Sequence, residues 1–76
     1  MLKMSFKSSR KPDQIIQDAE VFFGRRGLKP ALKRDVSVRF ESDRGFVDIE
    51  VTHQSEVTVE TGNLEPLVKQ FAEQVK

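Results

Sequence analysis

The chain has 76 residues, of which 37% are hydrophobic and 33% are charged, and it contains no cysteine. A chain this short holds one hydrophobic core, so we expect residues 1–76 to form a single compact domain. The lack of cysteine excludes disulfides and thiolate chemistry. No apolar run reaches the ~18 residues of a membrane span, so we expect a cytoplasmic protein without membrane contact.

Charge is divided unevenly along the chain, although the net charge is only +1. Residues 1–34 carry nine basic and three acidic side chains, whereas residues 35–76 carry four basic and nine acidic ones. Asymmetry of this kind is found in proteins that bind nucleic acid or an acidic partner. Two oppositely charged halves can also complement each other within one fold, and we expect that simpler explanation here.

The first two predicted elements are a strand and a helix. Residues 2–7, LKMSFK, alternate apolar and polar side chains, which is the pattern of a half-buried strand. After Pro12, which suits the first turn of a helix, apolar residues recur at helical spacing in a single stripe: Ile15, Ile16, Ala19, Phe22 and Phe23. We expect this helix to end at Gly27, with Arg25 and Arg26 in its last turn, where positive charge is favourable.

Residues 24–34, GRRGLKPALKR, form a basic segment with no acidic residue. Pro30 disfavours continuation of the helix, so we expect an exposed loop. This basic loop is the candidate contact for phosphate or for a partner. Its candidate residues, with Phe46 added as an outward-facing aromatic side chain, are Arg25, Arg26, Lys29, Lys33, Arg34 and Phe46.

The second half of the chain predicts three strands and a helix. Alternation recurs in 35–41, in 46–53 and in 56–61, and the short connections predict an antiparallel meander. Asn63 is the expected N-cap of a final helix with its own apolar stripe, and Pro66 suits its first turn. The element order is therefore β-α-β-β-β-α.

This order predicts an α+β fold, a two-layer sandwich of a mostly antiparallel four-stranded sheet with both helices on one face. The position of the first strand within the sheet stays open. We expect one core built from Phe6, Ile15, Phe22, Phe40, Ile49, Val59, Leu67 and Phe71.

Candidate catalytic groups are few. Asp48 and Glu50 are two residues apart on one predicted strand and so share its outer face, where paired carboxylates could act as acid and base or bind a hard cation. Charged residues are common on a solvated sheet face, however, and His53 is expected on the opposite side, in a turn. No nucleotide-binding or metalloprotease motif occurs. We therefore expect no enzyme activity, no catalytic residue, no metal and no cofactor.

The element order, with "GL" before "VRFE" and "GFVDIEV", resembles in outline the helix-grip domains and the small proteins of polyhydroxyalkanoate systems. This resemblance implies a small-ligand-binding, helix-grip-like module. It identifies no site residues.

Three functions stay open from the sequence. The first is a small non-enzymatic accessory or interaction domain that binds an unknown protein partner or itself, as a homodimer. The second is weak, nonspecific binding of nucleic-acid phosphates through the basic loop 24–34. The third is the helix-grip-like ligand-binding module. We favour the first, because the outer sheet face lacks the aromatic residues and basic charge that bind nucleic acid.

Overall fold

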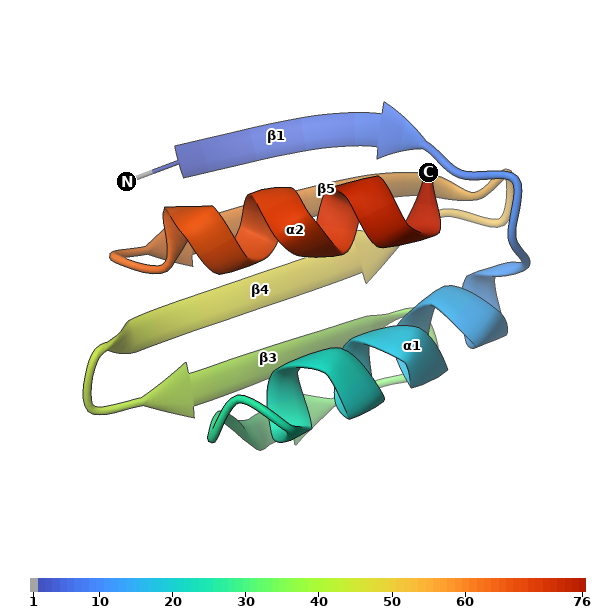
Figure 1. Ribbon diagram of the computed structural model, residues 1–76. Coiled ribbons are helices and arrows are strands. Elements are labelled where there is room, and N and C mark those ends of the chain that lie inside the picture. Colours follow the sequence, from blue (N-terminus) through green and yellow to red (C-terminus); the bar gives the residue numbers. More distant parts are fainter. Residues whose placement is uncertain (1) are drawn as a thin grey trace.

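A computed structural model describes residues 2–76 and shows, within them, two helices and a five-stranded antiparallel sheet (Figure 1). The elements in chain order are β1 (Leu2–Lys7), α1 (Pro12–Gly24), β2 (Lys29–Lys33), β3 (Ser37–Ser42), β4 (Gly45–Val51), β5 (Glu56–Gly62) and α2 (Glu65–Val75). The strand order across the sheet is β1-β5-β4-β3-β2. The α+β class and the meander of β3, β4 and β5 are thus confirmed, and β1 lies at one edge.

The prediction of a four-stranded sheet and of the order β-α-β-β-β-α is wrong, because part of the expected basic loop is strand β2. This strand pairs antiparallel with β3, and its register shifts between Pro30 and Leu32. All five residues of β2 are exposed, so no alternation of buried and exposed positions marks it in the sequence. Pro30 is tolerated because β2 is an edge strand and a missing N–H can face solvent there.

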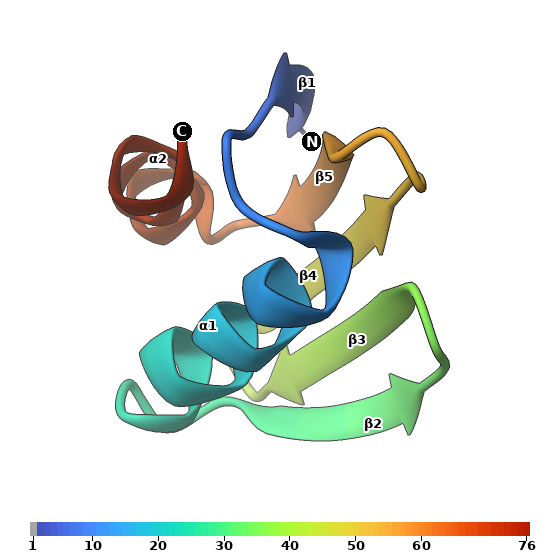
Figure 2. The same cartoon turned by 90° about the vertical axis from the view of Figure 1, so that its right-hand side faces the viewer.

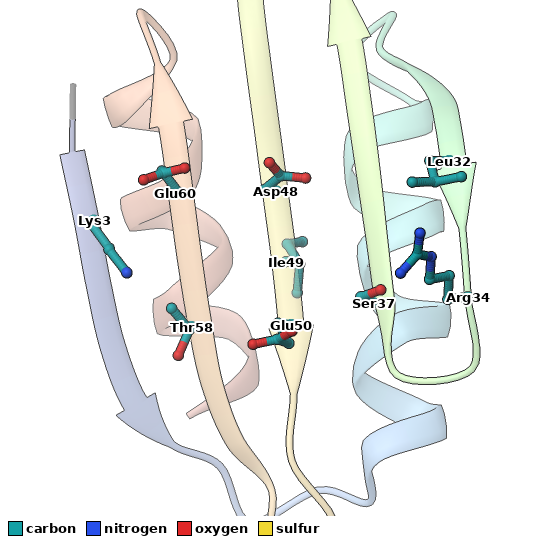
Figure 3. Close-up of a pocket in the computed structure, with 9 residues that line it drawn as sticks. All are labelled: Lys3, Leu32, Arg34, Ser37, Asp48, Ile49, Glu50, Thr58 and Glu60. Atoms are coloured by element: carbon teal, nitrogen blue, oxygen red, sulfur yellow. The ribbon is translucent and has the colours of Figure 1, made fainter.

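The two helices divide one side of the sheet between them (Figure 2). Helix α1 packs over β2, β3 and β4, α2 packs over β5, and the helices also contact each other. This arrangement differs in detail from the predicted layer, because each helix covers its own group of strands. The opposite side of the sheet, which we call the outer face, carries no helix of the described residues (Figures 2 and 3).

The core lies between the helices and the sheet. Phe23 is fully buried at its centre, with ring centroids 5.2 Å from those of Phe40 and Phe71. Six of the predicted core residues are buried, and the two exceptions, Phe6 and Leu67, are only partly buried against the cluster. Phe6 is less covered because β1 is an edge strand and α2 lies over β5 instead.

Both predicted helix boundaries need correction. Helix α1 ends at Gly24, so Arg25 is its C-cap and Arg26 lies beyond it. The N–H groups of Arg26 and Gly27 donate to the carbonyls of Phe23 and Gly24, three residues earlier, and these tighter bonds close the helix before Gly27. Gly27 lies in the following turn with φ +85°.

At the second helix, Leu64 rather than Asn63 is the N-cap, and no side chain caps the helix. Asn63 has φ +69°, a left-handed conformation that reverses the chain after β5. Pro66 lies in the first turn, as predicted.

Candidate interaction surface

The outer face is the surface that the fold leaves uncovered, and alternation along the strands selects its side chains. Directly opposed residues share a face, so the register with β3 also assigns Lys29 and Leu32 of β2 to it. Its main side chains are Lys3, Ser5, Lys7, Lys29, Leu32, Ser37, Arg39, Glu41, Phe46, Asp48, Glu50, Glu56, Thr58 and Glu60.

A shallow depression of about 320 Å³ crosses this face (Figure 3). Three carboxylates lie along its centre, on β4 and β5: Asp48, Glu50 and Glu60. Lys3 borders it from β1, and Arg34 and Leu32 border it from the opposite side. Leu32 is 53% exposed, so the depression combines both signs of charge with an apolar contact.

Arg39 organises the part of the outer face beside this depression. Its Nη1 donates to Asp48 Oδ2 at 2.7 Å and its Nε to Glu41 Oε2 at 2.8 Å. The hydrogen bond to Glu41, with the charge of Asp48, raises the pKa of Arg39 above its ordinary value. One guanidinium thus joins two neighbouring strands and engages two of the carboxylates of the face.

Phe46 is held beside this ion-pair group. The Arg39 guanidinium carbon lies 4.3 Å from the Phe46 ring centroid, a cation–π arrangement. Phe46 lies directly opposite Gly62 on β5, where a Cβ atom would come within 2.7 Å of Phe46 Cε1. The ring therefore packs across a glycine and under an arginine, so it is half-buried rather than an open platform for stacking a base.

The predicted basic residues do not form one patch. Arg26 turns back onto helix α1: its Nη1 donates to Phe22 O at 2.9 Å, and its guanidinium lies 3.6 Å from the Phe22 ring centroid. Lys33 bonds Glu20 of the same helix at 3.1 Å.

The remaining basic residues lie elsewhere. Lys29 belongs to the outer face, Arg34 borders the depression, and Arg25 is an exposed helix cap. Strand β2 separates Lys29 from Lys33 because its register shifts between Pro30 and Leu32. In a regular strand two residues four apart share a face, whereas the extra residue at this shift turns Lys33 to the opposite side of the sheet.

The candidate catalytic groups also lie apart. His53 is exposed in the turn between β4 and β5, whereas Asp48 lies on the outer face, bound by Arg39. Among residues 2–76, no three histidine, aspartate or glutamate side chains are grouped so that they could hold a metal ion. The part of the chain that the structure describes contains no helix able to cross a membrane.

The sequence predicted the outward positions of Phe46, Asp48 and Glu50 correctly but missed Leu32. The pattern of residues 29–33 predicts a loop, and in a loop no residue can be assigned to a face of the sheet. The available signal was weak: a leucine two residues after Pro30, within a segment bounded by lysines.

Comparison with protein-family models, curated proteins and solved structures found no significant match to this chain. The helix-grip resemblance therefore stays a prediction, and function has to be argued from the surface itself.

Proposed function

We propose that this chain is a non-enzymatic interaction domain that binds a partner protein through its outer face. The observation that carries the proposal is the depression on that face, with its acidic centre, basic borders and exposed Leu32. Protein–protein contacts typically combine complementary charge with a small apolar centre. Here the centre is acidic and the apolar residue, Leu32, lies at the border, so complementary charge is the feature of this surface that suits such a contact.

The same observation disfavours the two other functions. Nucleic-acid backbones need a basic groove, whereas the carboxylates of Asp48, Glu50 and Glu60 lie along the centre of this one. Small-ligand sites are usually enclosed and mostly apolar, whereas this depression is shallow and largely charged. A protein partner can supply both the lysines and the carboxylates that such a surface would pair with.

Affinity capture from the source cells, followed by titration with the purified partner, tests the proposal. Leu32→Ser and Glu50→Lys each change an exposed side chain of the depression and should abolish or strongly weaken capture. Val21→Ser is the matched control, because Val21 is 49% exposed but lies on α1, on the opposite side of the sheet. Unchanged melting temperatures would show that all three variants are folded.

Capture that survives both Leu32→Ser and Glu50→Lys would contradict the proposal, as would loss of capture with Val21→Ser alone. Turnover of a small molecule that Asp48→Asn abolishes would overturn its non-enzymatic part.

A further inference from the structure

The two edges of the sheet differ in how they present their backbone. At the β2 edge, Pro30 has no N–H to offer and the register shifts at the next residue, so the strand is irregular. Proline and irregular pairing are features by which natural edge strands avoid further pairing. At the other edge, β1 pairs with β5 in unbroken register from Leu2 to Lys7 and contains no proline.

The direction of the free backbone groups of β1 follows from its pairing. The N–H of Ser8, just after the strand, donates to Ser55 O on the β5 side at 2.9 Å. Because alternate residues of a strand point their backbone groups to opposite edges, Phe6 and Met4 also bond toward β5. The N–H and C=O groups of Lys3, Ser5 and Lys7 therefore face away from the sheet. Figures 1 and 2 show no described element beyond this edge.

Charge indicates what kind of strand fits there. On its paired side, β1 has Lys3 opposite Glu60, Ser5 opposite Thr58 and Lys7 opposite Glu56. Yet among the described residues neither Lys3 nor Lys7 makes an ion pair within 4 Å, so both ammonium groups remain available. A second acidic strand on the open side would place carboxylates beside the same two lysines.

The inward row of β1 supplies an apolar contact. Leu2, Met4 and Phe6 are only partly buried against the core, because α2 lies over β5. A neighbouring strand with apolar residues at alternate positions would cover them further.

We propose that the open edge of β1 binds an extended segment of the partner protein in which acidic and apolar residues alternate, adding a sixth strand to the sheet. The proposal rests on the proposed function for the existence of a protein partner. It assigns the open backbone edge of β1 as a contact, in addition to the part of the depression that Leu32 and Glu50 line. A second copy of β1 is a poorer occupant, since its outward row of Lys3, Ser5 and Lys7 contains no acid.

The probe for this edge is a capped peptide with the sequence of residues 56–62, EVTVETG, titrated into the ¹⁵N-labelled protein. The control peptide has both glutamates replaced by lysine. We expect the acidic peptide to shift the amide resonances of Lys3, Ser5 and Lys7 and to slow their hydrogen exchange. We expect the lysine peptide to bind much more weakly.

Two variants of the protein sharpen the test. Ser5→Pro removes an outward N–H and the exposed hydrogen bond between the Ser5 and Thr58 hydroxyls, but no backbone bond to β5. The fold should therefore persist while peptide binding is lost. Replacing Lys3 and Lys7 together by glutamine should weaken binding about two- to thirtyfold, the range for losing two cross-strand charge pairs. Lys69→Gln, an exposed lysine on α2, is the charge control and should leave binding unchanged.

The edge proposal is overturned if both peptides bind equally, if folded Ser5→Pro protein binds as the parent does, or if the shifts map to β2, β3 and β4 instead of β1. A concentration-dependent dimer that Ser5→Pro abolishes would also overturn it, with a second copy as the occupant. Capture of the cellular partner that depends on Leu32 but survives Ser5→Pro would overturn the edge alone and leave the proposed function standing.

Discussion

The two faces of the sheet are made from the same strands but differ in what holds their side chains. On the inner face, aromatic and branched aliphatic residues are buried against both helices. Phe40 of the sheet packs there against Phe23 of α1, which in turn contacts Phe71 of α2. On the outer face, Arg39 links carboxylates of neighbouring strands in contact with water. The inner face thus depends on close packing, whereas the outer face depends on solvent-screened charge, which contributes much less stability.

Truncation of a central aromatic residue should show this difference most strongly. Phe71 is fully buried on α2 and contacts the rings of Phe22 and Phe23, so Phe71→Ala should lower the free energy of unfolding by about 3–5 kcal/mol. Leu32→Ala on the outer face should change it by less than about 0.5 kcal/mol. Denaturant titration of both variants gives the comparison. Similar losses for the two would contradict the division between the faces.

A backbone position at the rim of the sheet should have the next largest effect. Gly45 has φ +156°, and a Cβ there would overlap the carbonyl oxygen of Gly62, so Gly45→Ala should cost about 1–3 kcal/mol. The same substitution at Gly24 is the control. A Cβ at Gly24 meets no atom within 4 Å, and Gly24 ends helix α1, so Gly24→Ala should be neutral or stabilising by up to about 1 kcal/mol. Thermal unfolding of both variants gives the comparison. Melting temperatures that shift in the same direction for Gly45→Ala and Gly24→Ala would refute the different roles of the two glycines.

The strands β1 and β2 show how far the sequence could predict this fold. LKMSFK alternates because one face of β1 packs against the core while the other is solvated, and that asymmetry leaves a period of two. KPALK has no buried residue, so its pairing with β3 depends on backbone bonds that any sequence can make. Because β2 was not predicted, Leu32 could not be assigned to a face and the segment was expected to be a basic loop. The outward positions of Asp48 and Glu50, in contrast, followed correctly from the alternation of β4.

The ion-pair group of the outer face should contribute less to the stability of the fold than the central aromatic residues do. Arg39→Gln removes both charged bonds and the contact over Phe46, so we expect a melting temperature lower than that of the parent but higher than that of Phe71→Ala. The difference should shrink as salt is added, because the pairs are solvent-exposed. The pKa of Arg39 is raised, so its contribution is present below its unfolded pKa and is lost only as pH rises through the folded value. If the decrease in melting temperature caused by Arg39→Gln differed between pH 6 and pH 8, this account would be contradicted.

The smallest effect is expected for nucleic-acid binding by the basic residues of segment 24–34. Arg26 is engaged with Phe22 and Lys33 with Glu20, while Lys29 lies on the other face, so no group of neighbouring cations can follow a phosphate backbone. We expect no binding of labelled duplex or single-stranded DNA even at low salt. If binding were seen, it should weaken with salt by a slope of about −0.9 per phosphate contact, and changing Lys29, Lys33 and Arg34 together to alanine should remove it. Strong binding at physiological salt would show that these cations converge in solution, and the outer face would then lose its place as the candidate surface.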